Sequence, residues 1–241
     1  MILNIYGYQD SGKTITVEKL VKKLVQKGYK VASVKHSNTD DEIDEEGKDT
    51  WRHWRAGSDP VVLSTKKGTV FFIHSGSSSY EIIDGLKCSH DPDVIILEGF
   101  KDSDIHPKIS VGDIKPRKGT VMSNPDLAAL VGYVEKEVAF ERLIKRLPML
   151  DCGKCGMDCN SLARAIVEGS RRMKDCREMP SRGVEILVGG KRMATGTFVS
   201  EIVDDTIRGM LGSLKGYEPD KDVEIRLRAN KQASKRSASK K

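Results

Sequence analysis

A glycine loop near the start of the chain constrains the fold more than any other feature of the sequence. It consists of Gly7, Tyr8, Gln9, Asp10, Ser11, Gly12, Lys13 and Thr14. These residues match the pattern G-x-x-x-x-G-K-[ST] in full. They follow the apolar run Met1 to Tyr6 and precede the amphipathic run Ile15 to Lys27. Strand, loop and helix in this order are the context in which such a loop holds phosphates.

The residue types of the glycine loop suit a polyphosphate. Gly7 and Gly12 keep side chains away from the backbone N–H groups that would face the phosphates. The following helix adds its free N–H groups and the positive end of its dipole. Lys13 offers a charge to the β- and γ-phosphates, and Thr14 offers a hydroxyl to Mg²⁺. We therefore predict a site for a nucleoside triphosphate with Mg²⁺.

The order of elements predicts an α/β fold of the P-loop NTPase type over residues 1–147, a mostly parallel sheet with helices on both faces. Strands at Ile2 to Tyr6 and Tyr29 to Lys35 enclose the amphipathic helix in a βαβ unit. Apolar runs predict further strands at 59–64, 69–74, 93–98, 106–111 and 127–133. Short helices are expected at 47–57 and 80–87, and a longer one at 136–147.

Glu98 follows a four-residue apolar run, Val94 to Leu97. Such a run is typical of a strand that is buried on both faces of a parallel sheet. Ligands of open α/β sheets bind at the carboxyl ends of the strands. A carboxylate there can hold Mg²⁺ or orient an attacking water, so Lys13 and Glu98 are the candidate catalytic residues. The plainer alternative is a surface carboxylate at a strand end.

Both tryptophans of the chain lie beside two arginines in the segment 47–57. Arg52 and Arg55 are three residues apart, so on a helix they share a face and can grip a phosphate or carboxylate. Asp49 or Thr50 is the expected N-cap. The acidic stretch 37–46 before it is either a solvated loop or one that orders when nucleotide binds.

These segments together resemble the molybdopterin-guanine dinucleotide biosynthesis protein B family. The resemblance covers roughly residues 1–147. Its specific parts are Gly47-Lys48-Asp49-Thr50 with Arg52, and Leu97-Glu98-Gly99-Phe100-Lys101. Its other parts are the glycine loop, Val34-Lys35-His36, Ala56-Gly57 and Pro107-Lys108-Ile109.

The resemblance implies a homodimeric protein that binds GTP with Mg²⁺, hydrolyses it slowly at most, and assists a guanylyltransferase that joins GMP to molybdopterin. It places the phosphates and Mg²⁺ at Lys13 and Thr14, and the metal or the water at Glu98. It also implies that three residues line the nucleotide or cofactor side: Lys48, Asp49 and Arg52. The sequence has no Asn-Lys-x-Asp run, so guanine specificity depends on the resemblance alone.

Four cysteines follow in the pattern Cys152-x2-Cys155-x3-Cys159-x16-Cys176. Glycines between the first three allow the chain to bend so that the thiolates converge, and an all-thiolate site suits an iron–sulfur cluster or zinc. The segment resembles a small [4Fe–4S]-binding domain of corrinoid and electron-transfer proteins, which more often has four residues between its second and third cysteines. A [4Fe–4S] cluster is the favoured expectation, and zinc is the alternative. Cys88 is expected to be an ordinary thiol.

Composition bounds the rest of the chain. Residues 148–180 form the four-cysteine segment, and 181–227 a small α+β cap with strands at 183–188 and 223–227 around a helix at 198–214.

The tail 228–241 holds six basic residues and no acidic one, which accounts for the net charge of +6. We expect this tail to be disordered, and the basic pI is then no sign of a nucleic-acid partner. No apolar run is long enough for a membrane span and no signal sequence is recognisable, so a cytoplasmic protein is expected.

Two other functions fit parts of the pattern. A P-loop metallochaperone would store a metal on the cysteines, with His36 or His53 as further ligands. A kinase would transfer the γ-phosphate to a small molecule, but only Glu98 is available as a candidate base.

Overall fold

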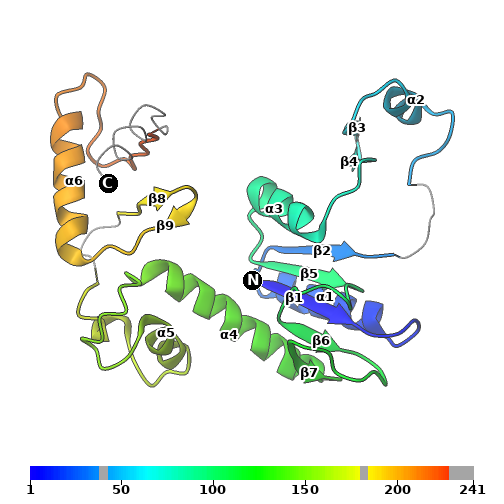
Figure 1. Cartoon of the computed structure of the whole chain (residues 1–241), viewed down its shortest axis with the longest axis horizontal. Coiled ribbons are helices and arrows are strands. Elements are labelled where there is room, and N and C mark those ends of the chain that lie inside the picture. Colours follow the sequence, from blue (N-terminus) through cyan, green and yellow to red (C-terminus); the bar gives the residue numbers. More distant parts are fainter. Residues whose placement is uncertain (38–42, 180–183, 228–241) are drawn as a thin grey trace, which may run out of the picture. The chain divides into compact units, whose positions relative to one another are not determined.

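The computed structural model describes residues 1–37, 43–179 and 184–227. The chain divides into two compact units, Met1–Arg146 and Leu147–Lys241. Figure 1 shows the elements of each unit. The predictions for the tail 228–241, and for the acidic residues 40–42, lie outside the described residues. The predicted boundary at residue 180, between the four-cysteine segment and the α+β cap, stays a prediction.

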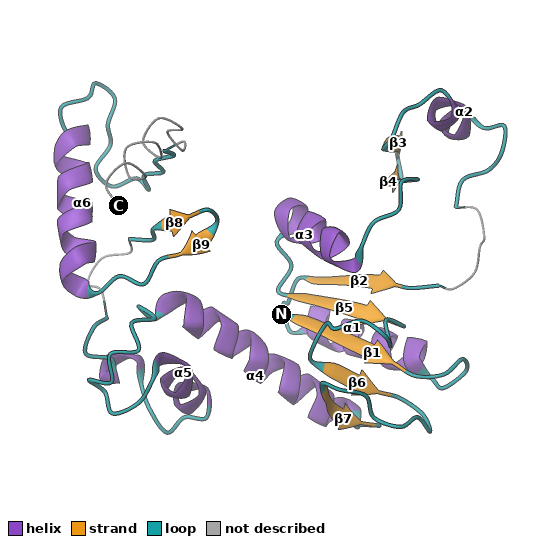
Figure 2. Ribbon diagram, viewed as in Figure 1, coloured by secondary structure: helices purple, strands orange, loops and turns teal. Residues whose placement is uncertain are grey.

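The first unit contains a five-stranded parallel sheet, as predicted. Its strands are β1 (Ile2–Tyr6), β2 (Val31–Lys35), β5 (Val94–Glu98), β6 (Lys108–Ser110) and β7 (Thr120–Ser123). They lie in the order β2-β5-β1-β6-β7, and every pairing is parallel. Figure 2 shows these strands side by side with their arrowheads at one edge. The carboxyl end of β1 therefore lies beside that of β5.

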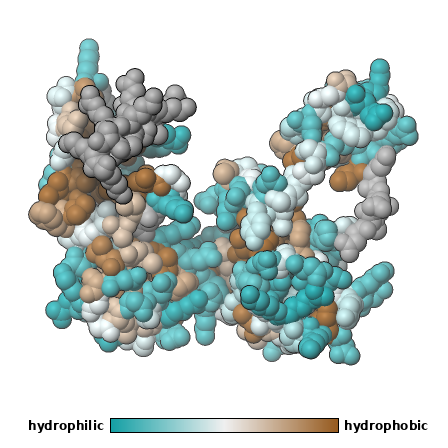
Figure 3. All heavy atoms as spheres, in the orientation of Figure 1, coloured by the Kyte–Doolittle hydropathy of each residue, from teal (hydrophilic) through white to brown (hydrophobic). Residues whose placement is uncertain are grey.

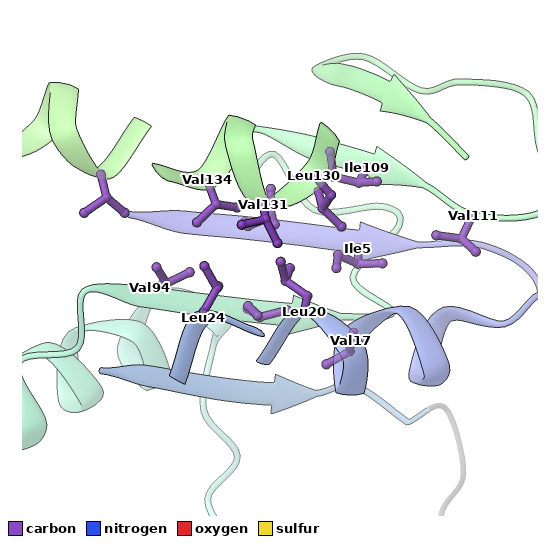
Figure 4. Packing of buried hydrophobic residues seen from close by; sticks show 13 residues of the cluster. Ile5, Val17, Leu20, Leu24, Val94, Ile109, Val111, Leu130, Val131 and Val134 are labelled. Atoms are coloured by element: carbon purple, nitrogen blue, oxygen red, sulfur yellow. The ribbon is translucent and has the colours of Figure 1, made fainter. Parts of the chain in front are cut away.

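Helices cover both faces of this sheet. Helices α1 (Lys13–Gln26) and α4 (Leu127–Arg146) pack in one apolar cluster with β1 and β6. Figure 4 shows Leu20, Leu24, Leu130 and Val134 meeting the strands there. Ile83 of α3 (Ser79–His90) packs in a second cluster with Ile95 and Leu97 of β5. Alternate residues of β5 thus enter opposite clusters, which explains its continuous apolar run.

Helix α4 corrects one expectation. Residues 127–133 were expected to be a strand, but they form the first two turns of α4, which runs on through the predicted helix. Leu130, Val134 and Val138 recur at intervals of four, a helical spacing that the short apolar run concealed. Asp126 accepts a hydrogen bond from the backbone N–H of Ala129 at 2.8 Å, which caps the start. The last strand is instead β7, a segment the sequence analysis missed.

A helix and a hairpin follow β2 before the chain returns to the sheet. Helix α2 (Asp49–Arg55) precedes the antiparallel strands β3 (Val61–Thr65) and β4 (Gly68–Phe72). We call β3 and β4 the hairpin arm. Its turn is at Lys66-Lys67, between the two predicted strands. The first position of α2 is Asp49 and its N-cap is Lys48, with no side-chain cap, so Asp49 does not cap the helix as expected.

In its described residues, the second unit has two α-helices and a short hairpin. Residues 160–174 have a helical sequence pattern, but helix α5 (Cys159–Val167) ends well before Lys174, because Gly169 takes a positive φ of 80° and turns the chain. A 3₁₀ turn, η1 (Met173–Asp175), comes next. Strands β8 (Leu187–Val188) and β9 (Lys191–Arg192) pair, and α6 (Thr197–Leu211) follows. Residues 223–227 were predicted to be a strand and are not one. Among the described residues, no helix is long and apolar enough to cross a membrane.

Candidate functional site

The glycine loop joins β1 to α1 at the carboxyl edge of the sheet. Gly12 is the N-cap of α1 and has a left-handed φ of 86°. The N–H of Ser11 donates to the carbonyl of Tyr8 at 3.3 Å. Within the described residues, the N–H groups of Gly12, Lys13 and Thr14 have no acceptor. Free N–H groups at a helix start favour a bound anion.

Close packing fixes the shape of this loop. A Cβ atom on Gly7 would lie 2.2 Å from the carbonyl oxygen of Val111 and 2.5 Å from Ser11 Oγ. A Cβ atom on Gly112 would lie 2.6 Å from Ser11 Cβ. The loop therefore packs against the chain that leaves β6, and a side chain at either glycine would push it away.

The side chain of Lys13 lies across the glycine loop. Its Nζ donates to the carbonyl oxygen of Tyr8 and lies 3.4 Å from Ser11 Oγ. The ammonium group thus stays beside the free N–H groups at the start of α1. Its positive charge adds to theirs in attracting an anion.

Glu98 lies at the end of β5, between β1 and β2. The register pairs it with Ile5 on one side and Lys35 on the other. Its Oε1 accepts hydrogen bonds from Thr14 Oγ1 at 2.8 Å and from Lys35 Nζ at 2.5 Å. The Glu98 side chain is 7% exposed. The structure thus brings Thr14 and Glu98, from elements far apart in sequence, into direct contact.

The environment keeps Glu98 ionised. Burial acts to raise the pKa of Glu98, because it removes water from the charged form. Hydrogen bonds from Lys35 and Thr14, with the charges of Lys35 and Lys13, outweigh it, and the pKa is lowered. Lys35 is a site residue that the sequence analysis did not single out. Only the register of β2 on β5 reveals it.

Three predicted site residues lie on or beside α2 and are exposed: Lys48, Asp49 and Arg52. Arg52 Nη1 lies 3.9 Å from Asp49 Oδ1, and Lys48 pairs with Glu45. In the described part of the chain, no hydrogen bond or ion pair joins them to the glycine loop. The guanidinium of Arg55 lies over Trp51 and Trp54, 5.5 and 5.6 Å from the ring centroids, and the expected grip of Arg52 and Arg55 on an anion stays a prediction.

The four cysteines of the second unit, which we call the thiol set, lie on a turn, a helix start and η1. Cys155 belongs to a turn in which the Gly156 N–H donates to the Gly153 carbonyl at 2.8 Å, and Cys152 directly precedes this turn. Cys159 is the first residue of α5, and Cys176 follows η1. The last two are buried, Cys155 is half-buried and Cys152 is exposed.

The thiol set shares one electrostatic environment. Burial raises the pKa of Cys176, and the thiolate charges of Cys159, Cys155 and Cys152 raise it further. The donors are those of an iron–sulfur or zinc site. As they stand, however, the described residues include no group of three or more Cys, His, Asp and Glu side chains that could hold a metal ion. The set fits a cluster in donor type and location, and the thiols would have to draw closer to bind one.

The shared carboxylate of Glu98 predicts a pH-dependent stability. Its lowered pKa means that ionised Glu98 stabilises the fold above the ordinary glutamate pKa. This contribution is lost as the pH falls through the lowered value in the folded state. We expect Glu98→Gln to reduce the free energy of unfolding by about 1–3 kcal/mol at neutral pH, and by less at about pH 3. Urea unfolding at both pH values measures this, with Glu18→Gln as a surface control. An equal deficit at both pH values would contradict it.

Comparisons with known proteins agree with the family resemblances found in the sequence. Residues 2–133 match the family described as "Molybdopterin guanine dinucleotide synthesis protein B", and residues 147–177 match one described as "Putative Fe-S cluster". A Methanocaldococcus jannaschii protein named "Putative molybdopterin-guanine dinucleotide biosynthesis adapter protein" is 31% identical, over 95% of this chain and 98% of its own.

Shorter relatives match about half of the chain. An adapter protein of molybdopterin-guanine dinucleotide biosynthesis from Haemophilus influenzae is 37% identical over 45% of this chain and 61% of its own. The solved structure of Bacillus subtilis MobB is 20% identical, covering 56% of this chain and 96% of its own, with a TM-score of 0.44. The resemblance read from the sequence is confirmed: the chain belongs to the molybdopterin guanine dinucleotide synthesis protein B family.

Proposed function

We propose that this chain is a GTP-binding adapter of molybdopterin-guanine dinucleotide synthesis. It binds GTP with Mg²⁺ in the glycine loop and hydrolyses it slowly at most. It assists the guanylyltransferase that joins GMP to molybdopterin. The observation that carries the proposal is the 2.8 Å contact between Thr14 Oγ1 and Glu98 Oε1 beside the free N–H groups of α1. The adapter named in Methanocaldococcus jannaschii, which this chain matches over nearly its whole length, supports the pathway.

The phosphates are held by main-chain and side-chain donors of the glycine loop. The N–H groups of Gly12, Lys13 and Thr14 are directed at the anion by the start of α1. Lys13 exchanges its bond to the Tyr8 carbonyl, seen here, for a phosphate oxygen. No acidic residue lies in the first turn of α1 to repel that charge.

Thr14 and Glu98 are the residues that would hold Mg²⁺. Their hydroxyl and carboxylate oxygens are the ligand types that this ion prefers, and the lowered pKa of Glu98 keeps the carboxylate charged. Bound Mg²⁺ neutralises phosphate charge and orients the phosphate oxygens. Lys35 holds Glu98 in place from the neighbouring strand.

The same contacts favour binding over rapid hydrolysis. Glu98 Oε1 already accepts two hydrogen bonds, and its lowered pKa makes it a weak base. A general base works best with a pKa near the working pH. This arrangement suits an adapter that uses bound nucleotide to change its contacts with a partner protein. It does not favour the kinase alternative, which needs a general base.

The hairpin arm supports a homodimer. Val62, Leu63, Val70 and Phe71 are between 42% and 66% exposed. Figure 3 shows apolar side chains on the surface of this region. Exposed apolar residues on a two-stranded hairpin favour a protein partner. Sedimentation equilibrium tests whether that partner is a second copy, and a monomer at micromolar concentrations would contradict the proposal.

Three exposed residues on or beside α2 are proposed to line the nucleotide or cofactor side: Lys48, Asp49 and Arg52.

In the second unit we propose a [4Fe–4S] cluster on the thiol set. The match of residues 147–177 to an iron–sulfur family supports it. The alternatives are structural zinc or, in a metallochaperone, an exchangeable metal. Anaerobically purified protein should contain iron and acid-labile sulfide, and Cys176→Ser should lose both while Cys88→Ser keeps them. Stoichiometric zinc, or nickel that exchanges freely, would favour the alternatives.

The nucleotide proposal makes a direct prediction. Lys13→Ala removes the one side-chain cation that lies on the glycine loop, and we expect GTP affinity to fall about a hundredfold or more. Calorimetry of the full chain measures it, and Lys19→Ala, an exposed cation on the same helix, is the matched control. Unchanged affinity in Lys13→Ala, with the fold intact by circular dichroism, would refute the site.

A further inference from the structure

A hollow in the second unit lies beside the thiol set. Its volume is about 250 Å³, and its walls are Lys154, Cys155, Arg171, Lys174, Asp175 and Arg177. We call it the basic hollow, since four cations and one carboxylate line it. The turn that carries Cys155 forms one wall, and the chain from α5 through η1 forms the other.

The cations of the basic hollow differ in whether an ion pair or a side-chain hydrogen bond engages them. Lys154 forms an ion pair with Glu178. Within the described residues, no ion pair or side-chain hydrogen bond engages Arg171, Lys174 or Arg177. The Asp175 carboxylate accepts the backbone N–H of Arg172 at 3.0 Å, and within the described residues it forms no ion pair with these three cations. These three cations thus share one concavity with a single carboxylate, and such an excess of positive charge is unfavourable unless an anion joins it.

We propose that the basic hollow binds a phosphate-bearing ligand through its diphosphate or phosphate group. Two guanidinium groups offer planar forks that match phosphate oxygens, and Lys174 adds a point charge. The hollow is smaller than the pockets of about 300–1,000 Å³ that enclose whole drug-sized ligands. It therefore takes the anionic end of a ligand, and the rest extends into solvent. This site is separate from the glycine loop and does not depend on GTP binding there.

A competing explanation must be separated from this one. The same cations could offset the negative charge of the thiolates, since Cys155 lines the hollow. The pKa of Lys154 is raised first by its hydrogen bond to Glu178, and the charge of Cys152 raises it further. However, the cation placed for that role is Lys154, which lies in the turn itself. Arg171 and Arg177 have guanidinium groups whose hydrogen-bonding capacity no protein acceptor fills in the described part of the chain. That free capacity favours an external anion.

Inorganic pyrophosphate is the probe, because it carries the diphosphate chemistry alone. It is titrated by calorimetry into the full chain carrying Lys13→Ala, so that the glycine loop contributes least. We expect one binding event, and the further pair Arg171→Ala and Arg177→Ala should weaken it about tenfold or more. The matched control pair is Arg172→Ala and Lys215→Ala, two exposed cations outside the hollow, which should change the affinity by no more than about twofold. Lys174→Gln is a milder second test if the arginine pair fails to fold.

The outcomes decide between the explanations. Inorganic phosphate and GMP, titrated in the same way, distinguish a free diphosphate from a single phosphoryl group and from a nucleotide. Absence of pyrophosphate binding in Lys13→Ala, or binding that the arginine pair leaves unchanged, would overturn the proposal. Loss of iron in the arginine pair with unchanged pyrophosphate affinity would assign the cations to the thiol set. Failure of the GTP proposal appears separately, as GTP affinity that survives Lys13→Ala.

Discussion

One carboxylate joins the parts of the candidate nucleotide site. Glu98 is buried at the end of β5, and its Oε1 receives both the hydroxyl of Thr14 and the ammonium of Lys35. A buried charge is costly unless it is paired and hydrogen-bonded, so these two donors are what permit a carboxylate here. Because β5 lies between β2 and β1, the arrangement ties three neighbouring segments at the carboxyl edge of the sheet. The position of the glycine loop follows from it and from the packing of Gly7 on Val111.

The sequence predicted those parts of the fold whose signals are local. The glycine loop, the amphipathic spacing of α1 and the uniformly apolar β5 each determine their own structure. The strand predicted at 127–133 was wrong, because a short apolar run is compatible with either a strand or a buried helix. Only the packing of these residues against α1 and the sheet shows that they form a helix. Lys35 was missed as a site residue because its role comes from strand register, which no local pattern encodes.

The second unit shows the same limit. Cysteine spacing predicted one site for the four thiols, and this stays a prediction, since the described residues include no group of three or more such side chains that could hold a metal ion. The spacing said nothing of Arg171 or Arg177, since unpaired cations become informative only when the fold places them around one hollow. The chain therefore combines a proposed nucleotide site, a thiol set and a basic hollow, and the last two share Cys155. Anionic ligands in both units would suit a protein that serves the joining of a nucleotide to a phosphorylated cofactor.

The most direct test is calorimetric titration of GTP and ATP into the anaerobically purified full chain, in Mg²⁺ and again in EDTA. If Thr14 and Glu98 form the metal side of a nucleotide site, GTP affinity should fall at least about tenfold without Mg²⁺. GTP should also bind more tightly than ATP. GTP affinity that is indifferent to Mg²⁺ would contradict the account, because the buried carboxylate would then have no part in binding the nucleotide.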